Sequence, residues 1–176
     1  MGGGGGDPLH LGTELAALHD ASFGWALACC GRDRAVAEDV LQDAYFKVLD
    51  GRARFGGQAA FKTWLFGVIR MTAREHRRWS FLRGPAANDE DVEIKDEKRA
   101  PDSDVGARER AVQLEKALAR LADRQREVLH LVFYEELSIA EAATVMNVSL
   151  GTARQHYERG KHVLAGLLDP LSRENP

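Results

Sequence analysis

The strongest constraint on the fold is the spacing of apolar residues, which is helical in both halves of the chain. Apolar residues three and four positions apart share one face of an α-helix. One such set is Phe61, Trp64, Leu65, Val68, Ile69 and Thr72, and another is Leu114, Leu118, Leu121, Val128, Leu129, Val132 and Phe133. Since no segment alternates apolar and polar residues at a period of two, the sequence predicts an all-α fold without strands.

A Gly84-Pro85 pair and a strongly acidic run separate the two halves. Residues 88–104 contain eight acidic side chains and only three basic ones. Gly-Pro ends a helix, and dense charge with little apolar surface does not compensate the entropy of ordering. The sequence therefore predicts two small helical domains, residues 10–83 and 108–170, joined by an acidic flexible linker over 84–107. The acidity either solvates a tether or repels nucleic acid when the protein is free.

The composition of the 176 residues predicts a protein without membrane insertion. The hydrophobic fraction of 44% is enough for a packed core, but no apolar run approaches the roughly 20 residues that span a bilayer. The glycine-rich start, Met1 to Gly6, lacks the basic and apolar regions of a secretory signal. We therefore expect a cytoplasmic protein.

Potential metal ligands and nucleophiles are few and scattered. The two cysteines, Cys29 and Cys30, are adjacent, so we expect free, buried thiols in a reducing compartment rather than a disulfide or a zinc site. The six histidines form no His-x-x-x-His pair, and no glycine-rich phosphate loop is present. The sequence predicts no metal, no cofactor and no enzymatic activity.

Residues 137–157 have the features of a helix-turn-helix. Ser138 and Glu141 form a capping box, and Asn147 tolerates the left-handed conformation that ends a short helix. Ser149 is a second N-cap, which opens a helix predicted to run to about Leu168. The small residues Ala142, Ala143 and Ala153 allow the two helices to approach closely, as in the motif that places its second helix in the DNA major groove.

The outward face of this second helix is suited to DNA. Arginine can pair with guanine, glutamine with adenine and glutamate with a cytosine amine, while other polar side chains contact phosphates. The candidate residues are Ser149, Thr152, Arg154, Gln155, Glu158, Arg159 and Lys161. The net charge of −3 does not exclude DNA binding, because residues 61–83 carry six basic side chains against one acid, Glu75. The plain alternative is a helical hairpin with a charged surface.

Three segments together resemble the extracytoplasmic-function (ECF) subfamily of sigma-70 RNA polymerase sigma factors, which are bacterial transcription initiation factors. Residues 121–129, 136–138 and 149–154 are similar to the domain that binds the promoter −35 element. Residues 37–48 resemble the helix that docks on polymerase, and residues 61–70 resemble the −10 promoter helix. The resemblance spans about residues 10–168. It implies core RNA polymerase, promoter DNA and an anti-sigma factor as partners.

The resemblance also implies roles for particular residues. The polymerase-binding residues would be Glu38, Asp39, Gln42 and Asp43, which we expect on the helix face opposite Leu41 and Tyr45. The −10 DNA would contact Arg54, Phe55, Gln58, Arg70, Arg74 and Arg77, with a flipped-out base held by the loop 55–60. We expect Phe61 and Trp64 in the core rather than as stacking platforms, because they lie on the apolar stripe.

The sequence departs from the subfamily at positions that affect promoter choice. Met71 stands where an asparagine is frequent, and His156 and Glu158 replace residues that are commonly arginine and a bulkier apolar side chain. No known promoter consensus can therefore be transferred to this chain. The alternative to a sigma factor is a dimeric helix-turn-helix regulator that binds duplex DNA without polymerase.

Overall fold

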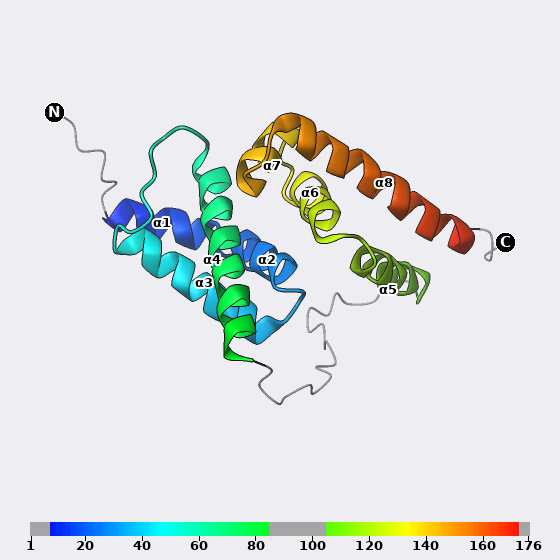
Figure 1. Cartoon of the computed structure of the whole chain (residues 1–176), viewed down its shortest axis with the longest axis horizontal. Helices are drawn as coiled ribbons and strands as arrows, with labels where there is room; N and C mark the ends of the chain where they lie inside the picture. Colours follow the sequence, from blue (N-terminus) through cyan, green and yellow to red (C-terminus); the bar gives the residue numbers. More distant parts are fainter. Residues whose placement is uncertain (1–7, 85–104, 173–176) are drawn as a thin grey trace.

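The computed structural model describes residues 8–84 and 105–172, and these fold entirely into α-helices and their connections (Figure 1). The eight helices are α1 (Pro8–Ala17), α2 (His19–Cys29), α3 (Arg34–Leu49), α4 (Phe61–Arg83), α5 (Val105–Ala119), α6 (Asp123–Phe133), α7 (Ile139–Met146) and α8 (Leu150–Ser172). The all-α prediction is confirmed for these ranges. The predicted linker lies largely outside the described residues. No described helix is both long and apolar enough to cross a membrane.

The N-terminal half packs α4 against α2 and α3. Its central side chain is Trp25, which is fully buried, stacks on Phe66 with the ring centroids 5.9 Å apart, and donates from its indole nitrogen to the carbonyl oxygen of Phe66 at 3.0 Å. Asp33 caps α3, because its Oδ1 accepts from the backbone N–H of Val36 at 3.0 Å. The predicted stripe on α4 is confirmed at Leu65, Val68, Ile69 and Thr72, which are buried.

The helix-turn-helix of the C-terminal half forms as predicted. The Ser138 Oγ accepts from the Glu141 N–H at 3.2 Å, while the Glu141 carboxylate accepts from the Ser138 N–H at 2.8 Å. The Ser138 backbone N–H lowers the pKa of the Glu141 carboxyl. Asn147 is left-handed, with φ 53° and ψ 51°. Ser149 caps α8 through the Thr152 N–H at 3.1 Å, and α8 continues past the predicted end near Leu168.

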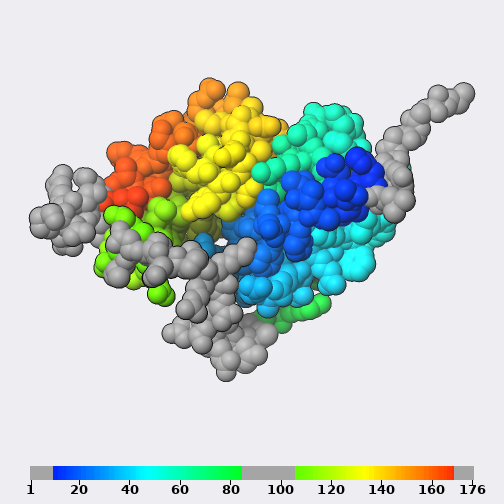
Figure 2. Space-filling view, turned by 180° about the vertical axis from the view of Figure 1, so that it is seen from behind, coloured from blue at the N-terminus to red at the C-terminus, as the bar shows by residue number. Residues whose placement is uncertain are grey.

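The two halves share one buried apolar core, which the sequence did not predict. The cluster contains Leu65 and Ile69 of α4 together with Val128 of α6 and Val145 and Met146 of α7. Figure 2 shows α6 and α7, in yellow, lying against the blue and teal helices of the N-terminal half. Helix α4 is therefore covered on one side by α2 and α3 and on another by α7.

Two glycines of α8 test how tightly this helix is packed. A Cβ on Gly160 would lie 3.1 Å from Leu129 Cδ1 and 3.2 Å from Gln125 Cβ, whereas a Cβ on Gly166 would meet nothing within 4 Å. Gly166→Ala should raise the free energy of unfolding by about 0.5–1 kcal/mol through helix propensity. Gly160→Ala should lower it by about 1 kcal/mol, because overpacking outweighs the same propensity gain. Urea unfolding followed by circular dichroism measures both, and equal effects would contradict the close α6–α8 packing.

Cys29 and Cys30 are free, as predicted, but they are partly rather than fully buried. Burial raises the pKa of the Cys29 thiol well above its usual value and that of Cys30 to about 11. No group of metal-binding side chains occurs among the described residues.

Both thiols should therefore stay protonated at neutral pH. Because the thiolate is the nucleophile, iodoacetamide at pH 7.5 should alkylate the folded chain about 100-fold more slowly than free cysteine. Mass spectrometry measures the rate, and the same reaction in urea is the control in which both thiols should react at the ordinary rate. Rapid alkylation of the folded chain would contradict the raised pKa values.

Candidate nucleic-acid interface

Helix α8 presents a continuous polar face to solvent. Ala153, as predicted, and Gly160 are buried on its inner side. The predicted DNA-binding residues Arg154, Gln155, Glu158, Arg159 and Lys161 are all exposed on its outer side. Exposed side chains on one face of a helix can reach base edges and phosphates in a groove.

Four of the predicted DNA-binding residues already pair with one another within the chain. Thr152 is half-buried, and its Oγ1 lies 2.8 Å from the Ser149 Oγ, so both hydroxyls take part in the cap. The ammonium group of Lys161 lies 3.7 Å from the Glu158 carboxylate and 4.9 Å from the centre of the Tyr157 ring. Arg154, Gln155 and Arg159 are consequently the better placed residues for direct readout.

In the loop between α3 and α4, Gln58 is exposed and Phe55 belongs to an aromatic cluster. The Phe55 ring packs edge-on against Phe61, with the ring centroids 5.4 Å apart, and it contacts Trp64 with the centroids 5.3 Å apart. Phe61 and Trp64 are half-buried and pack on the core, in line with the prediction. Arg54 turns back on the loop, since its Nε donates to the Gly51 carbonyl oxygen at 3.1 Å.

The three predicted arginines of α4 differ in accessibility. Arg74 and Arg77 are exposed, and Arg77 makes only a long 3.7 Å contact with Asp123. Arg70 is 4% exposed and donates through two nitrogens to the Glu127 carboxylate of α6, at 3.1 Å each. In this arrangement Arg70 does not reach the surface. Its contact with DNA stays a prediction that requires α4 and α6 to separate.

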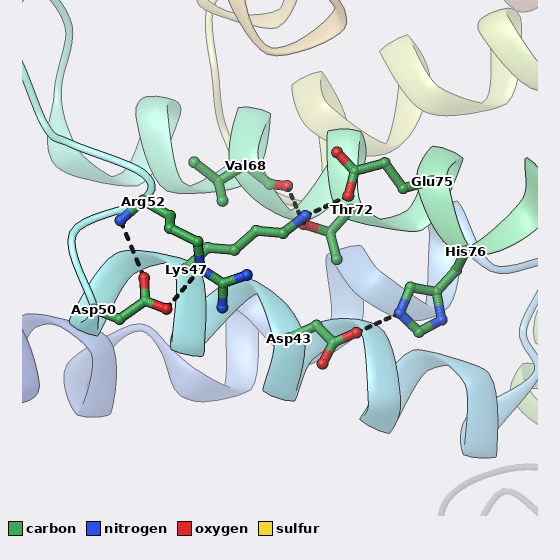
Figure 3. A network of polar contacts seen from close by, with 8 residues as sticks. All are labelled: Asp43, Lys47, Asp50, Arg52, Val68, Thr72, Glu75 and His76. Atoms are coloured by element: carbon green, nitrogen blue, oxygen red, sulfur yellow. Dashed lines mark hydrogen bonds and ion pairs between the residues drawn. The ribbon is translucent and has the colours of Figure 1, made fainter. Parts of the chain in front are cut away.

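The predicted docking helix α3 carries its four polar candidates on the surface. The Asp43 carboxylate lies 2.6 Å from the His76 ring nitrogen of α4. The Lys47 ammonium donates to Thr72 and to Glu75 of the same helix (Figure 3). Asp39 is exposed beside them, and Glu38 pairs with Arg34 at 3.0 Å.

One part of the α3 prediction is wrong. Glu38 and Gln42 do not lie opposite Leu41 and Tyr45, because all four line the same shallow hollow on the surface. The reason is the helical period: positions 38, 41, 42 and 45 follow the i, i+3, i+4, i+7 pattern of a single face.

Sequence reasoning missed an exposed apolar residue on the predicted docking face. Phe46 is 56% exposed. It lies seven residues after Asp39 and three after Asp43, so the three share one face of α3. A large exposed aromatic among acids is typical of the anchor of a protein interface. The signal was present in the spacing, since an aromatic that continues a polar stripe cannot point into the core.

The chain matches two family models that together cover most of both halves. The model described as Sigma-70 region 2 matches residues 16–79, and that of Sigma-70 region 4 matches residues 117–164. The RNA polymerase sigma-H factor of Pseudomonas aeruginosa is 31% identical over 153 residues, covering 81% of this chain and 78% of that relative. The ECF RNA polymerase sigma factor SigX of Bacillus subtilis is 28% identical, covering 81% and 76%.

Solved structures support the same fold. The sigma factor RpoE of Bartonella quintana, in complex with the anti-sigma factor NepR, superposes with a TM-score of 0.69 at 24% identity, covering 89% of this chain and 95% of that one. CnrH, in complex with the cytosolic domain of CnrY, gives 0.64 at 22% identity, covering 94% and 91%. The chain belongs to the sigma-70 family of RNA polymerase sigma factors, in its ECF subfamily. It is a transcription initiation factor, and the resemblance inferred from its motifs is confirmed.

The exposed face of α8 can be tested by removing single side chains. Arg154→Ala and Gln155→Ala should each lower transcription from the chain's own promoters about tenfold, since a bidentate base contact contributes about 1–3 kcal/mol of discrimination. Binding to core polymerase should not change. Arg108→Ala, at an exposed arginine of α5, removes the same charge and should have little effect. An equal loss for Arg108→Ala would indicate a general charge effect rather than base readout.

Proposed function

We propose that this sigma factor docks on core RNA polymerase through α3, contacts the −35 element with α8 and captures a base of the −10 element at the loop between α3 and α4. The observation that carries the proposal is the simultaneous exposure of three separate polar surfaces on one helical body. These are the acidic face of α3, the tip of the loop at Gln58 and the outer face of α8.

The docking surface combines charge with an apolar anchor. Asp39 and Asp43 favour a basic partner, and Gln42 adds an amide donor and acceptor. Phe46 supplies apolar surface that would be removed from water on docking. Glu38 lies at the edge of this surface in its pair with Arg34. Such a mixture of apolar centre and polar rim is the usual composition of a stable protein interface.

The −10 surface combines an accessible loop with cations. Gln58 is exposed, and the aromatic cluster that Phe55 forms in the same loop would offer an apolar wall for an unstacked base. Arg54, Arg74 and Arg77 are exposed and would contact the phosphates of the melted strand. Arg70 would join them once it is released from Glu127.

The division into domains supports recognition of two promoter elements together. We propose that residues 10–83 and 108–170 act as separate DNA-binding units, with residues 84–107 between them. Each unit alone offers few phosphate contacts, so each binds DNA weakly at physiological salt. Fixing both on polymerase makes the second contact effectively intramolecular, which raises the overall affinity without new contacts.

Regulation by an anti-sigma factor is part of the proposal. RpoE of Bartonella quintana, which has the same fold, is known in complex with the anti-sigma factor NepR. CnrH, also of this fold, is known in complex with the cytosolic domain of CnrY. We propose that an anti-sigma factor likewise binds this chain and competes with polymerase. We further propose that the chain acts in the cytoplasm, where its polymerase and promoters are, and that it catalyses no reaction itself.

Charge reversal on α3 tests the docking assignment. Asp39→Lys combined with Asp43→Lys should weaken binding to core polymerase at least about 100-fold, because two attractive contacts become repulsive. Phe46→Ala should weaken it about tenfold through loss of the anchor. The measurement is a titration of core polymerase with labelled protein. Glu109→Lys with Glu136→Lys, at two exposed acids away from α3, makes the same change of net charge and should bind normally. Unchanged binding of the double variant would mean that α3 does not dock on polymerase.

In vitro transcription separates a sigma factor from a dimeric regulator. Core RNA polymerase from the source organism should start at specific sites on a library of upstream fragments only when this protein is added. The aligned start sites would then give the −35 and −10 sequences. A dimeric regulator would instead shift palindromic duplexes in a gel without polymerase, and would leave core polymerase inactive.

A further inference from the structure

Two polar side chains of α3 reach across to α4 at the edge of the predicted docking face. Asp43 and Lys47 lie four residues apart, so they stand one helical turn from each other on the same side of α3. The Asp43 Oδ2 lies 2.6 Å from the His76 Nε2. The Lys47 ammonium donates to the Thr72 Oγ1 at 3.1 Å and also to the Glu75 carboxylate (Figure 3). Three contacts therefore tie this side of α3 to a single turn of α4.

These contacts lie too near the surface to contribute much to folding. The side chains of Asp43 and Glu75 are 53% and 46% exposed, and those of His76 and Lys47 are partly exposed. Ion pairs in such places add little to the free energy of unfolding, because water screens the charges and two side chains lose freedom. The apolar core already packs α3 against α4. The main consequence of the polar contacts is therefore the orientation of the side chains that make them.

The contact with His76 holds the Asp43 carboxylate without covering it. A carboxylate only accepts hydrogen bonds, so the His76 Nε2 carries the proton in this contact. The contact engages Oδ2, and more than half of the Asp43 side chain is exposed, so the carboxylate remains accessible to a partner. An acceptor that is oriented in advance loses less conformational freedom on binding than one that rotates freely.

Glu75 acts on a charge that would oppose docking. Lys47 follows Asp43 by one turn, so its ammonium would repel a basic partner that approaches the acids of α3. The Glu75 carboxylate and the Thr72 hydroxyl both accept hydrogen bonds from that ammonium. Thr72 is itself fixed, because its hydroxyl donates to the Val68 carbonyl oxygen at 2.9 Å. The positive charge of Lys47 is therefore turned toward α4 and offset there.

We propose that His76 is a positioning residue for the binding of RNA polymerase. It holds the Asp43 carboxylate toward a basic side chain of the partner, while Glu75 offsets the neighbouring charge of Lys47. The polymerase-binding surface therefore depends on α4 as well as on α3. The inference rests on the proposed function, since it requires that α3 docks on polymerase. It adds two residues of α4 that the spacing within α3 does not reveal.

Substitutions at His76 test the positioning. In a titration of core polymerase with labelled full-length protein, His76→Ala should bind about fivefold more weakly, because Asp43 is then free to rotate. His76→Gln should restore the parent affinity, since its amide nitrogen can donate to the same oxygen. The matched control is His10→Ala on α1, because His10 is exposed and lies 3.9 Å from the Glu14 carboxylate; it should bind normally. Unchanged or tighter binding of His76→Ala would overturn the inference, and so would equal losses for His76→Ala and His76→Gln.

A double-mutant cycle determines whether His76 acts through Asp43. If it does, His76→Ala should weaken binding no further in a chain that already carries Asp43→Ala, because the group that His76 orients is absent. Losses that multiply in the double variant would mean that His76 affects polymerase binding independently of Asp43, and would overturn the positioning role. Circular dichroism should show equal helix content in all variants, since the contacts lie at the surface.

The role of Glu75 is tested by the same titration. Glu75→Gln leaves the Lys47 charge without its partner and should weaken binding about threefold, and additional Lys47→Met should reverse the loss. A loss that persists in the double variant would overturn the role of Glu75. These outcomes are distinct from a failure of the proposed function. If Asp39→Lys with Asp43→Lys weakens binding but the cycle shows multiplying losses, the docking surface stands and only the inference fails. Normal binding of the charge-reversed variant would instead exclude docking through α3.

Discussion

The arrangement of the molecule depends on the burial of α4 from two sides. Trp25 of α2 fixes its inner face by stacking on Phe66 and donating to the Phe66 carbonyl oxygen. On the other side, Leu65 and Ile69 join Val145 and Met146 of the helix-turn-helix in one apolar cluster. Removing this surface from water is the main favourable contribution to the contact, and two ion pairs, Arg70–Glu127 and Lys62–Glu135, lie within it. The position of the helix-turn-helix relative to the N-terminal helices follows from how α4 is packed.

This packing gives the functional surfaces different degrees of availability. The acidic face of α3 and the outer face of α8 lie away from the shared core, so the described structure leaves both exposed. The cationic side of α4 lies at the core, and its charges are balanced by Glu127 and Glu135. The acidic face of α3 is therefore open to a partner, whereas the cationic side of α4 is covered by the C-terminal half. The contact is sensitive to the loss of either partner of an ion pair, because a buried charge without its partner is strongly destabilising.

Much of the local structure followed directly from the sequence. The capping box at Ser138 and Glu141, the left-handed Asn147 and the cap at Ser149 were predictable because each depends on residues within four positions. The helical stripe of α4 was predictable for the same reason. The helix α3 itself was predicted correctly, but the prediction placed Glu38 and Gln42 on the wrong face of it. It also did not include the exposed Phe46.

The sequence by itself determined the helices, the helix-turn-helix and the family, since these are set by local spacing and by motifs that lie close together in the chain. Only the tertiary structure decided that Arg70 is paired and covered, that Lys62 meets Glu135 across 73 positions of sequence, and that both halves share a core. An arginine on a predicted DNA-binding helix has the same local pattern whether it faces solvent or a carboxylate. Its partner is chosen by the packing of distant segments, and no periodicity within one segment records that choice.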